Sequence, residues 1–471
     1  MFNIEDLTEA TGGKLIDFVP REIEGFSIDT RNLTEGEFFI PLPGSRTDGH
    51  KFLEEAFEKG ASGAFIRSRD YVEPEFFNLV IVDDTEAALL NAAKRYRSRF
   101  DVPVAGVTGS WGKTTTKELI ASILSKSGKV HKSPGNYNTE YGLPLSLLEM
   151  KRDVDYGVFE LGLQYPGDVG RLSEVLSPTI GLITGVGKVH AEHFQSIREI
   201  AEEKLKLTKG MEPCSKILIN GDSETLLAGA KDVPDYEFIE YGAKETEKKY
   251  TARDIMIRGT DGVAFQLNSG RNRPALDDKL GDLNFRLESG LNSRANVSNI
   301  VGASALALEM GISSTDVKKG VNINPLPQRL DPIEFSGGKV IDDTYNANPA
   351  ATINALEFIG EIESAERKFF VFGDMKELGK NALDDHKELA SYIKEAGINY
   401  LLAIGELTEA LVKDLDVKST QAEWFESRDG LKRRLNKLIG KYDNLVLVKG
   451  SRSMEMEYFV SFLTEGKNNR S

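Results

Sequence analysis

The chain has 471 residues, of which 40% are hydrophobic and 28% charged, with a formal net charge of -15 at pH 7. A chain of this length exceeds a single hydrophobic core and predicts about three domains. The acidic balance argues against a nucleic-acid partner, which needs a basic face. Cys214 is the only cysteine, so no internal disulfide can form, as is typical of proteins in a reducing cytoplasm.

The beginning of the chain is acidic and lacks the apolar core of a signal peptide. No apolar run reaches the roughly 18 residues that suggest a membrane-spanning helix. We therefore expect a cytoplasmic protein with no membrane partner, and we expect it to be a monomer.

Residues 1–97 carry short strand and helix patterns separated by turn signals such as Pro41–Gly44. We interpret this segment as a mixed α/β domain. From residue 98 onward, strands alternate with longer helical stretches. That alternation predicts βαβ units around a mostly parallel sheet.

Residues 103–117 are the most informative segment. An apolar strand is followed by a glycine-bearing turn, and Lys113 and Thr114 then open a helical pattern. The N–H groups of such a turn bind phosphate, the lysine reaches the β- and γ-phosphates, and the threonine hydroxyl binds Mg²⁺. Gly106 lies one residue further from Lys113 than the common phosphate-loop pattern requires. The alternative is a glycine-rich turn that binds nothing.

The rest of the chain predicts two further α/β units. The central unit has expected strands at 156–161, 179–184 and 216–220, a polar stretch of shorter strands and loops at 221–295, and a helix at 296–310. Residues 322–328 hold two prolines and are interpreted as a linker. Beyond it, strands are expected at 340–341, 368–372, 400–404 and 444–448. The predicted fold class is α/β with three domains: a mixed α/β domain at 1–97, a parallel sheet like that of phosphate-loop ATPases at 98–322, and a Rossmann-like domain at 323–471.

Polar residues end several of these strands, where an open α/β sheet binds its ligands. Glu160 ends one strand, and a carboxylate there suits Mg²⁺. His190 follows the next strand, although His193 lies only three residues further and spacing alone does not choose between them. The polar run 342–349 and the glycine, serine and cations of 449–457 follow two other strands. Together these segments predict a site that binds ATP and a metal and activates an acid.

These motifs resemble the Mur ligase family over nearly the whole chain. The loop 106–115, Gly-Val-Thr-Gly-Ser-Trp-Gly-Lys-Thr-Thr, is similar to the ATP loop of that family, including the extra residue, and 136–144 is similar to its Asn-rich substrate segment. The segments 342–349, 373–379 and 449–457 resemble the member that adds a dipeptide. Asp29–Arg31 and Thr47–His50 resemble its UDP-substrate domain.

The resemblance implies ATP and Mg²⁺ as cofactors and assigns residues to them. The expected ATP-binding residues are Thr108, Gly109, Ser110, Trp111, Gly112, Lys113, Thr114, Asn296, Asn299, Arg329 and Asp343. The expected metal ligands are Thr114, Glu160, His190 and Lys204, and the expected catalytic residues are Lys113, Glu160, His190 and Lys204. Lys204 would be carbamylated, because a carbamate attracts Mg²⁺ where an ammonium would repel it; from helical spacing alone it would be a solvated lysine. One departure is Ala295, where family members often carry histidine before the asparagine.

The resemblance also implies an ATP-dependent ligase in peptidoglycan precursor synthesis. Its partners would be UDP-N-acetylmuramoyl-tripeptide, whose carboxylate attacks the γ-phosphate of ATP, and D-alanyl-D-alanine, whose amine attacks the resulting acyl phosphate. The expected substrate-binding residues are Thr30, Arg31, Thr47, Asp48, Asn138, Thr139, Asn346, Asn348, Lys449 and Arg452. We assign Asn346 and Asn348 to the dipeptide; the alternative is that their loop contacts only ATP.

The sequence argues against several other functions, among them a phosphate-loop helicase or GTPase, which the acidic charge disfavours. A folylpolyglutamate synthase relative or a different Mur ligase is disfavoured by the segment 342–349, and the Asp-Asn-Pro-Arg motif of the member that adds the third residue is absent. A nucleotide-binding regulator without catalysis is disfavoured because Lys113, Glu160 and His190 are all present. Whether the third residue of the accepted tripeptide is lysine or diaminopimelate stays open.

Overall fold

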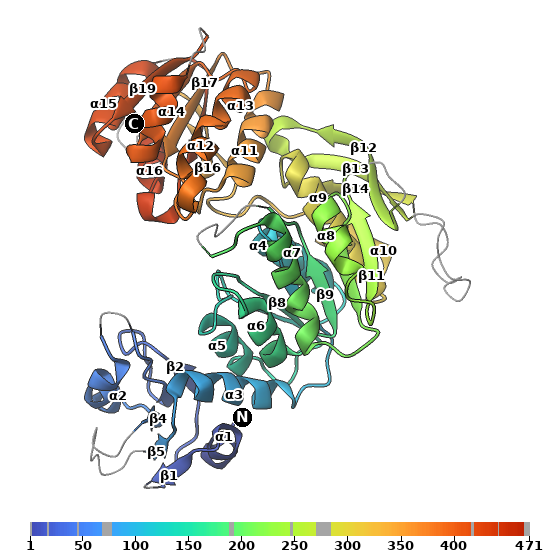
Figure 1. The fold of residues 1–471 in the computed structure, drawn as a ribbon, viewed down its shortest axis with the longest axis vertical. Helices are drawn as coiled ribbons and strands as arrows, with labels where there is room; N and C mark the ends of the chain where they lie inside the picture. The colour runs from blue at the N-terminus through green and yellow to red at the C-terminus, as the bar shows by residue number, and fades with distance from the viewer. Residues whose placement is uncertain are drawn as a thin grey trace.

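The described part of the chain folds into three units, each built around one β-sheet. The structure, a computed structural model, describes residues 2–16, 18–44, 47–67, 78–187, 193–244, 248–269, 284–415, 419–440 and 442–465. The sheets lie within residues 14–81, 104–289 and 331–449 and follow one another along an elongated molecule (Figure 1). The α/β fold class is confirmed. The predicted domain boundaries after residues 97 and 322 stay predictions.

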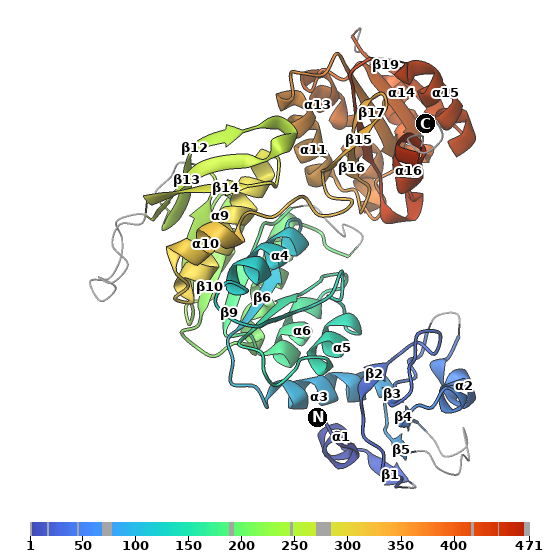
Figure 2. The ribbon, with the colours of Figure 1, turned by 180° about the vertical axis from the view of Figure 1, so that it is seen from behind.

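The first sheet has five short strands in the order β1-β5-β4-β3-β2, parallel except for β1. These strands are β1 (Lys14–Ile16), β2 (Gly25–Ser27), β3 (Glu37–Phe39), β4 (Gly63–Ile66) and β5 (Asn78–Ile81), and the helices are α1 (Ile4–Thr11), α2 (Leu53–Glu58) and α3 (Thr85–Arg97). The apolar face of α3 belongs to a core that extends from this sheet into the central one. The helix therefore joins the two units, as Figure 2 shows.

The central sheet has nine strands in the order β14-β13-β12-β11-β10-β9-β6-β8-β7. Neighbouring strands from β7 to β12 run parallel, as the sequence predicts, and β13 and β14 extend the sheet antiparallel. The strands are β6 (Val104–Thr108), β7 (Val130–Lys132), β8 (Tyr156–Glu160), β9 (Ile180–Ile183), β10 (Lys216–Asn220), β11 (Glu237–Gly242), β12 (Tyr250–Ile257), β13 (Val263–Ser269) and β14 (Asn284–Ser289).

Helices cover both faces of the central sheet (Figures 1 and 2). One face packs against α4 (Lys113–Leu124), α9 (Arg294–Glu309) and α10 (Ser314–Gly320), and the other against α5 (Gly142–Leu148), α6 (Asp168–Leu176), α7 (Ile197–Leu205) and α8 (Glu224–Ala230). The prediction of shorter strands at 221–295 is wrong, since β12 spans eight residues. Its outer half is partly exposed, and the exposed polar residues hide the strand pattern.

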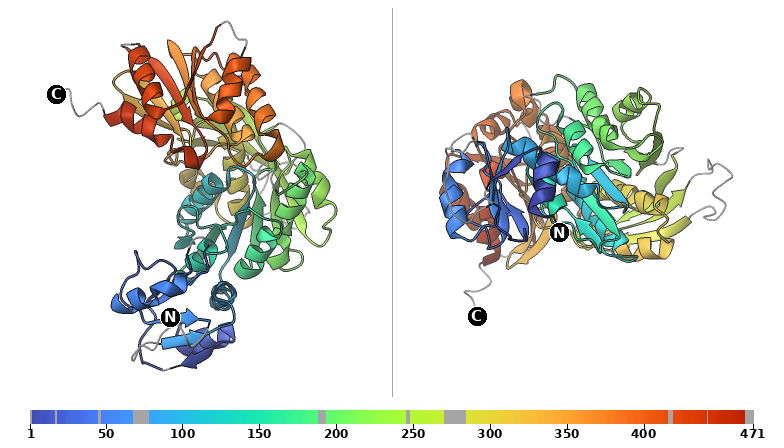
Figure 3. Two further views of the ribbon diagram at one scale, coloured as in Figure 1. Left: turned by 60° about the vertical axis from the view of Figure 1, so that its left-hand side comes forward. Right: turned by 90° about the horizontal axis from the view of Figure 1, so that it is seen from below.

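The third sheet has six strands in the order β15-β16-β20-β17-β18-β19, parallel except for the hairpin of β15 and β16. The strands are β15 (Asp331–Phe335), β16 (Gly338–Asp343), β17 (Arg367–Gly373), β18 (Tyr400–Ile404), β19 (Gln421–Phe425) and β20 (Asn444–Lys449). The helices are α11 (Pro349–Glu361), α12 (Ala382–Lys387), α13 (Leu389–Glu395), α14 (Glu406–Asp414), α15 (Arg428–Ile439) and α16 (Glu457–Glu465). They cover both faces, and Figure 3 shows this unit stacked on the central one.

The chain passes between the second and third sheets through residues 321–330, which are extended or turn-like. Gln328 and Leu330 both have positive φ, at 62° and 52°, a conformation that non-glycine residues seldom adopt. This connection places Arg329 between the two units. Within the residues that the structure describes, no helix is long and apolar enough to cross a membrane.

Candidate active site

The glycine turn after β6 forms the predicted phosphate loop. Gly109 and Gly112 have φ values of 153° and 74°. A Cβ atom at Gly109 would overlap the Thr184 hydroxyl, and one at Gly112 would overlap the side-chain amide of Asn299. Only glycine fits at either position. The helix α4 begins at Lys113, so the loop presents a helix N-terminus, which attracts anions.

The phosphate loop is fixed on the segment that follows β9. The backbone N–H of Ser110 donates to Gly185 O at 2.8 Å, and its hydroxyl bonds both the N–H (3.1 Å) and the carbonyl (3.2 Å) of Gly187. The Trp111 ring covers the same two glycines, since a Cβ atom at Gly187 would overlap it. The Thr184 hydroxyl donates to the Trp111 carbonyl. Loop and segment therefore form one rigid unit.

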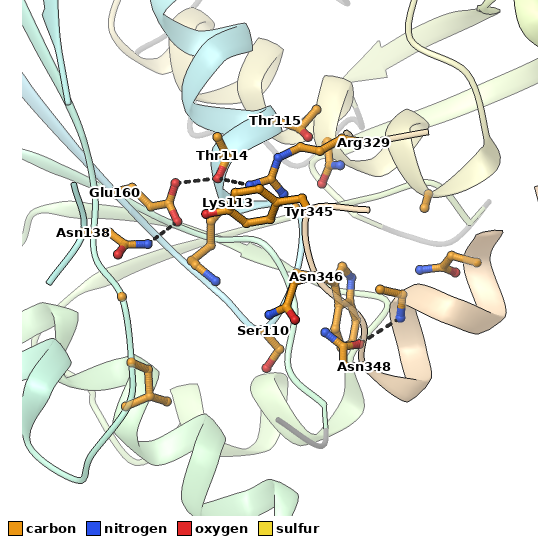
Figure 4. Close-up of a pocket in the computed structure, with 18 of the residues that line it drawn as sticks. Ser110, Lys113, Thr114, Thr115, Asn138, Glu160, Arg329, Tyr345, Asn346 and Asn348 are labelled. Carbon is orange, nitrogen blue, oxygen red and sulfur yellow. Dashed lines mark hydrogen bonds between the residues drawn. The ribbon is translucent and has the colours of Figure 1, made fainter. Parts of the chain in front are cut away.

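Glu160 lies beside the phosphate loop at the end of β8 and is 2% exposed. It accepts a hydrogen bond from the Thr114 hydroxyl at 2.7 Å and another from the Asn138 side-chain amide at 2.7 Å, both drawn in Figure 4. A buried carboxylate beside a hydroxyl is a set of hard oxygen donors, which fits Mg²⁺. His190, another predicted ligand, lies outside the described residues.

Lys113 extends from the first residue of α4, and its ammonium donates to Gly109 O at 3.0 Å. Burial lowers the pKa of the Lys113 ammonium, an effect that the Glu160 carboxylate opposes. The side chain carries its charge beside the loop that presents N–H groups, where an anion would be bound.

Lys204, on α7, is fully buried. Among the described residues its Nζ has no hydrogen-bond partner. Burial, reinforced by the charge of Lys113, holds the pKa of this amine well below its ordinary value. The solvated lysine that helical spacing alone suggests is therefore wrong. A buried amine with a lowered pKa is chemically suited to react with carbon dioxide and form a carbamate.

Two further segments complete the nucleotide side. On α9, Asn299 donates to the side chain of Asn296 at 3.0 Å, next to the phosphate loop. From the linker, Arg329 donates to the Thr114 hydroxyl at 3.0 Å, and its guanidinium lies 3.9 Å from the centre of the Tyr345 ring. Figure 4 shows Arg329 and Tyr345 side by side above the phosphate loop.

The third unit adds the loop after β16. Lys449 is buried and bonds Asp343 at 2.5 Å and the backbone carbonyl of Asn346 at 3.0 Å. Asn348 caps α11 by accepting from the N–H of Ala351 at 2.9 Å. Lys449 thus holds the loop in place, and one side of Asn348 is used by the helix.

These segments surround a cavity of ≈ 410 Å³. The predicted site residues that line it are Ser110, Trp111, Gly112, Lys113, Thr114, Asn138, Thr139, Glu160, Asn296, Asn299, Arg329, Asp343, Asn346, Asn348 and Lys449. The sequence missed other lining residues, among them Tyr345, which lies inside a motif, and Arg171, which no motif marks. Thr108 and Lys204 are buried behind the lining. Arg452 does not line the cavity and pairs with Glu457 at 2.8 Å.

The predicted residues of the first unit lie away from this cavity. Arg31 is 85% exposed and holds Asp29 through both carboxylate oxygens. The Thr30 carbonyl accepts from Lys59 at 2.6 Å. Asp48 accepts from the backbone N–H of His50, while Thr47 accepts from Gly44 through its carbonyl. These residues lie in turns and loops of the first unit, which α3 joins to the central unit.

A parallel α/β sheet with a phosphate loop, facing a second α/β sheet across a cavity rich in polar groups, defines a nucleotide-binding protein of the multidomain α/β class. Three family descriptions match in succession: "Mur ligase family, catalytic domain" at residues 22–103, "Mur ligase middle domain" at 107–307 and "Mur ligase, glutamate ligase domain" at 328–452. The chain belongs to the Mur ligase family.

Individual relatives agree over the full length. The UDP-N-acetylmuramoyl-tripeptide–D-alanyl-D-alanine ligase of Bacillus subtilis (strain 168) is 32% identical over 470 residues, covering 98% of both chains. The ligase of the same name from Escherichia coli (strain K12) is 30% identical, covering 98% of this chain and 99% of the relative.

Solved structures match as well. A crystal structure of MurF from Acinetobacter baumannii superposes with a TM-score of 0.88 at 25% identity, covering 98% of this chain and 99% of that one. MurF from Thermotoga maritima in complex with ADP has a TM-score of 0.81 at 25% identity, covering 95% and 98%. The fold is therefore shared across all three units.

Proposed function

We propose that this chain is an ATP-dependent amide ligase that joins D-alanyl-D-alanine to UDP-N-acetylmuramoyl-tripeptide in the cytoplasm, releasing ADP and phosphate. The observation that carries the proposal is the hydrogen bond between Thr114 and Glu160, which line a cavity between the second and third units together with Lys113. Relatives of that name match the whole chain. We further propose that its domains are residues 1–97, 98–322 and 323–471 and that it acts as a monomer.

The phosphates of ATP would lie on the loop from Gly109 to Thr114. Backbone N–H groups and the N-terminus of α4 attract the phosphate oxygens, and Lys113 places a positive charge beside them. Arg329 approaches from the linker, and the T. maritima relative bound to ADP supports a nucleotide in this fold. Asn296, Asn299 and Asp343 are proposed to bind the nucleoside.

Thr114, Glu160, His190 and Lys204 are the proposed ligands of magnesium. Bound there, Mg²⁺ would offset the charge of the phosphates and of the attacking carboxylate. Lys204 would first have to become an anion. Burial lowers the pKa of its amine, which favours the neutral form that makes an N–C bond with carbon dioxide, loses a proton and becomes a carbamate.

The proposed reaction has two steps. The tripeptide carboxylate attacks the γ-phosphorus, the bond to ADP breaks, and an acyl phosphate forms. The amine of D-alanyl-D-alanine then attacks the acyl carbon, phosphate leaves, and the amine loses a proton. The chain's contribution is to orient the reactants, hold Lys113 against the developing charge, and exclude water that would hydrolyse the intermediate.

The peptide substrates are proposed to enter from two sides. Thr30, Arg31, Thr47 and Asp48 of the first unit would bind the UDP portion, and Asn138 and Thr139 the peptide. Asn346 and Asn348 would bind the dipeptide from the third unit, in a loop that Lys449 positions. Because Asn348 already caps α11 through its oxygen, its side-chain NH₂ is the group offered to the dipeptide carboxylate.

A product assay tests the proposal. The purified chain is incubated with ATP, Mg²⁺, UDP-N-acetylmuramoyl-tripeptide and D-alanyl-D-alanine, and the mass of the product is measured by mass spectrometry. We expect one amide and one ADP per turnover, and we expect both products to require the tripeptide and the dipeptide together. Glu160→Gln should abolish formation of both products. ADP release at full rate without D-alanyl-D-alanine, or an unaltered tripeptide, would contradict a ligase.

A further inference from the structure

Arg171, on α6, lines the cavity but takes part in no step proposed above. Its guanidinium lies 3.3 Å from the Glu86 carboxylate and 3.7 Å from that of Asp168, and its side chain is 45% exposed. Both distances are long for charged partners, which normally meet at about 2.8 Å. By contrast, Arg31 grips Asp29 at 2.6 Å. Arg171 is therefore a loosely held cation on the cavity wall.

Both carboxylates beside Arg171 have other partners. Asp168 accepts from the backbone N–H groups of Gln164 at 2.9 Å and Tyr165 at 2.7 Å. Glu86 accepts from the Tyr141 hydroxyl at 3.2 Å. Burial, together with the charge of Glu86, raises the pKa of that hydroxyl to about 12, so it stays a donor at neutral pH. These hydrogen bonds use part of the accepting capacity of each carboxylate. The Arg171 guanidinium therefore keeps N–H donors for a further anion.

The position of Arg171 fits the path of a peptide. Asn138, which donates to Glu160, and Tyr141, which donates to Glu86, lie on one short segment. Glu86 lies in the first turn of α3, the helix that joins the first unit to the central one. In Figures 1 and 2, α3, α5 and α6 lie between the first sheet and α4. A substrate bound at both the first unit and the phosphate loop would pass this wall.

We propose that Arg171 binds one of the non-reacting carboxylates of the tripeptide substrate. This inference rests on the proposed function. One relative from A. baumannii is titled as acting on a UDP-N-acetylmuramoylalanyl-D-glutamyl-2,6-diaminopimelate. Such a peptide keeps one free glutamyl carboxylate and, besides the reacting carboxylate, a second one on diaminopimelate. A guanidinium binds a carboxylate through two parallel hydrogen bonds, which fixes the peptide in one orientation.

Four UDP-N-acetylmuramoyl-tripeptides test the proposal with the Arg171→Met variant. They combine D-glutamate or its amide, D-isoglutamine, with diaminopimelate or lysine. For the peptide with both extra carboxylates, we expect kcat/KM to fall at least 10-fold while the KM values for ATP and D-alanyl-D-alanine stay within 2-fold. For the isoglutamine–lysine peptide, which lacks both, we expect no change.

The two remaining peptides identify which carboxylate is bound. A loss that persists with glutamate–lysine assigns the glutamyl carboxylate, and a loss that persists with isoglutamine–diaminopimelate assigns the other. Arg171→Lys should recover part of the loss, since it keeps the charge without the second hydrogen bond. Arg198→Met is the matched control: this exposed arginine pairs with Glu202 within its own helix and does not line the cavity.

Two results would overturn the inference. An equal loss with all four peptides would mean that Arg171 only supports the wall, and no loss with any of them would mean that it binds no peptide. Both results presuppose that the wild-type chain ligates the peptides. If the wild-type chain ligates none of the four, the proposed function itself fails.

Discussion

Two lysines lie one turn apart on α4, and we expect one to carry a functional charge and the other a structural one. Lys113 is half-buried, and within the described residues it makes one hydrogen bond, to Gly109 O at 3.0 Å. Lys117 is fully buried and donates to the backbone carbonyls of Ser133 at 2.7 Å and Gly135 at 3.1 Å. The methionine variants of the two lysines should therefore fail in opposite ways.

In Lys113→Met, the cation proposed to lie against the γ-phosphate is lost. Removing one such stabilising group costs about 10²- to 10³-fold in kcat, or about 3–4 kcal/mol of transition-state free energy. The free energy of unfolding should change by no more than about 1 kcal/mol, since a single neutral-acceptor hydrogen bond is lost. Steady-state ADP release and denaturant unfolding measure the two quantities.

In Lys117→Met, the buried carbonyl of Ser133 and the exposed carbonyl of Gly135 lose a charged donor, and Glu118 loses an ion pair at 3.2 Å. The buried hydrogen bond alone is worth about 1.5–3 kcal/mol, so the free energy of unfolding should fall by at least that amount. The kcat of the protein that remains folded should stay within a few-fold of wild type. A Lys113→Met enzyme that keeps kcat within a few-fold of the parent would refute the assignment of Lys113 to the phosphates.

Three further variants probe the surroundings of the site. Lys204→Met should lose about 10³-fold in ligation, because the proposed carbamate ligand of Mg²⁺ is removed; full wild-type activity in buffer free of carbon dioxide would instead argue against a carbamate. Gly187→Ala should displace the Trp111 ring, because the new methyl group would overlap it, and so shift the tryptophan fluorescence. The KM for ATP should rise about 10-fold, which corresponds to about 1.4 kcal/mol of lost binding free energy. An unchanged emission spectrum and KM would show that the ring does not position the loop. Burial and the facing Asp342 raise the pKa of Asp331 to about 6, so the folded state holds a proton that the unfolded state has released, and wild-type stability should fall as pH rises from 4 to 6. Asp331→Asn should remove that fall and be about 1 kcal/mol more stable at pH 7, allowing for solvent screening of a partly exposed group; parallel pH–stability curves for the two proteins would contradict this.

Local patterns predicted the elements around the glycine turn. The strand β6, the glycine turn and the start of α4 at Lys113 follow from residues close together in sequence, because glycine conformation and helix initiation are local properties. The strand β20 was also predicted, since most of it is a continuous apolar run, whereas β16 was predicted only at its apolar centre, 340–341. The antiparallel extension of the central sheet was underestimated because its partly exposed strands are rich in polar residues.

Tertiary burial is what the sequence could not supply. Helical periodicity gives Lys204 and Arg171 no distinction from any other helix cation, yet Lys204 is fully buried and Arg171 lines the cavity. Only the resemblance to a family singled out Lys204, and nothing singled out Arg171. Asn348 illustrates the converse: a polar residue before Pro349 is a helix cap as well as a candidate ligand.

The central claim is that the tripeptide carboxylate is phosphorylated before the amide forms. Tripeptide labelled with ¹⁸O in its reacting carboxylate tests this most directly, with the released phosphate analysed by mass spectrometry. Transfer of one carboxylate oxygen to phosphate for each amide formed is the result that an acyl phosphate requires. Amide formation with unlabelled phosphate would mean that the γ-phosphate never reaches the carboxylate, and the account of Lys113 and Glu160 would fall with it.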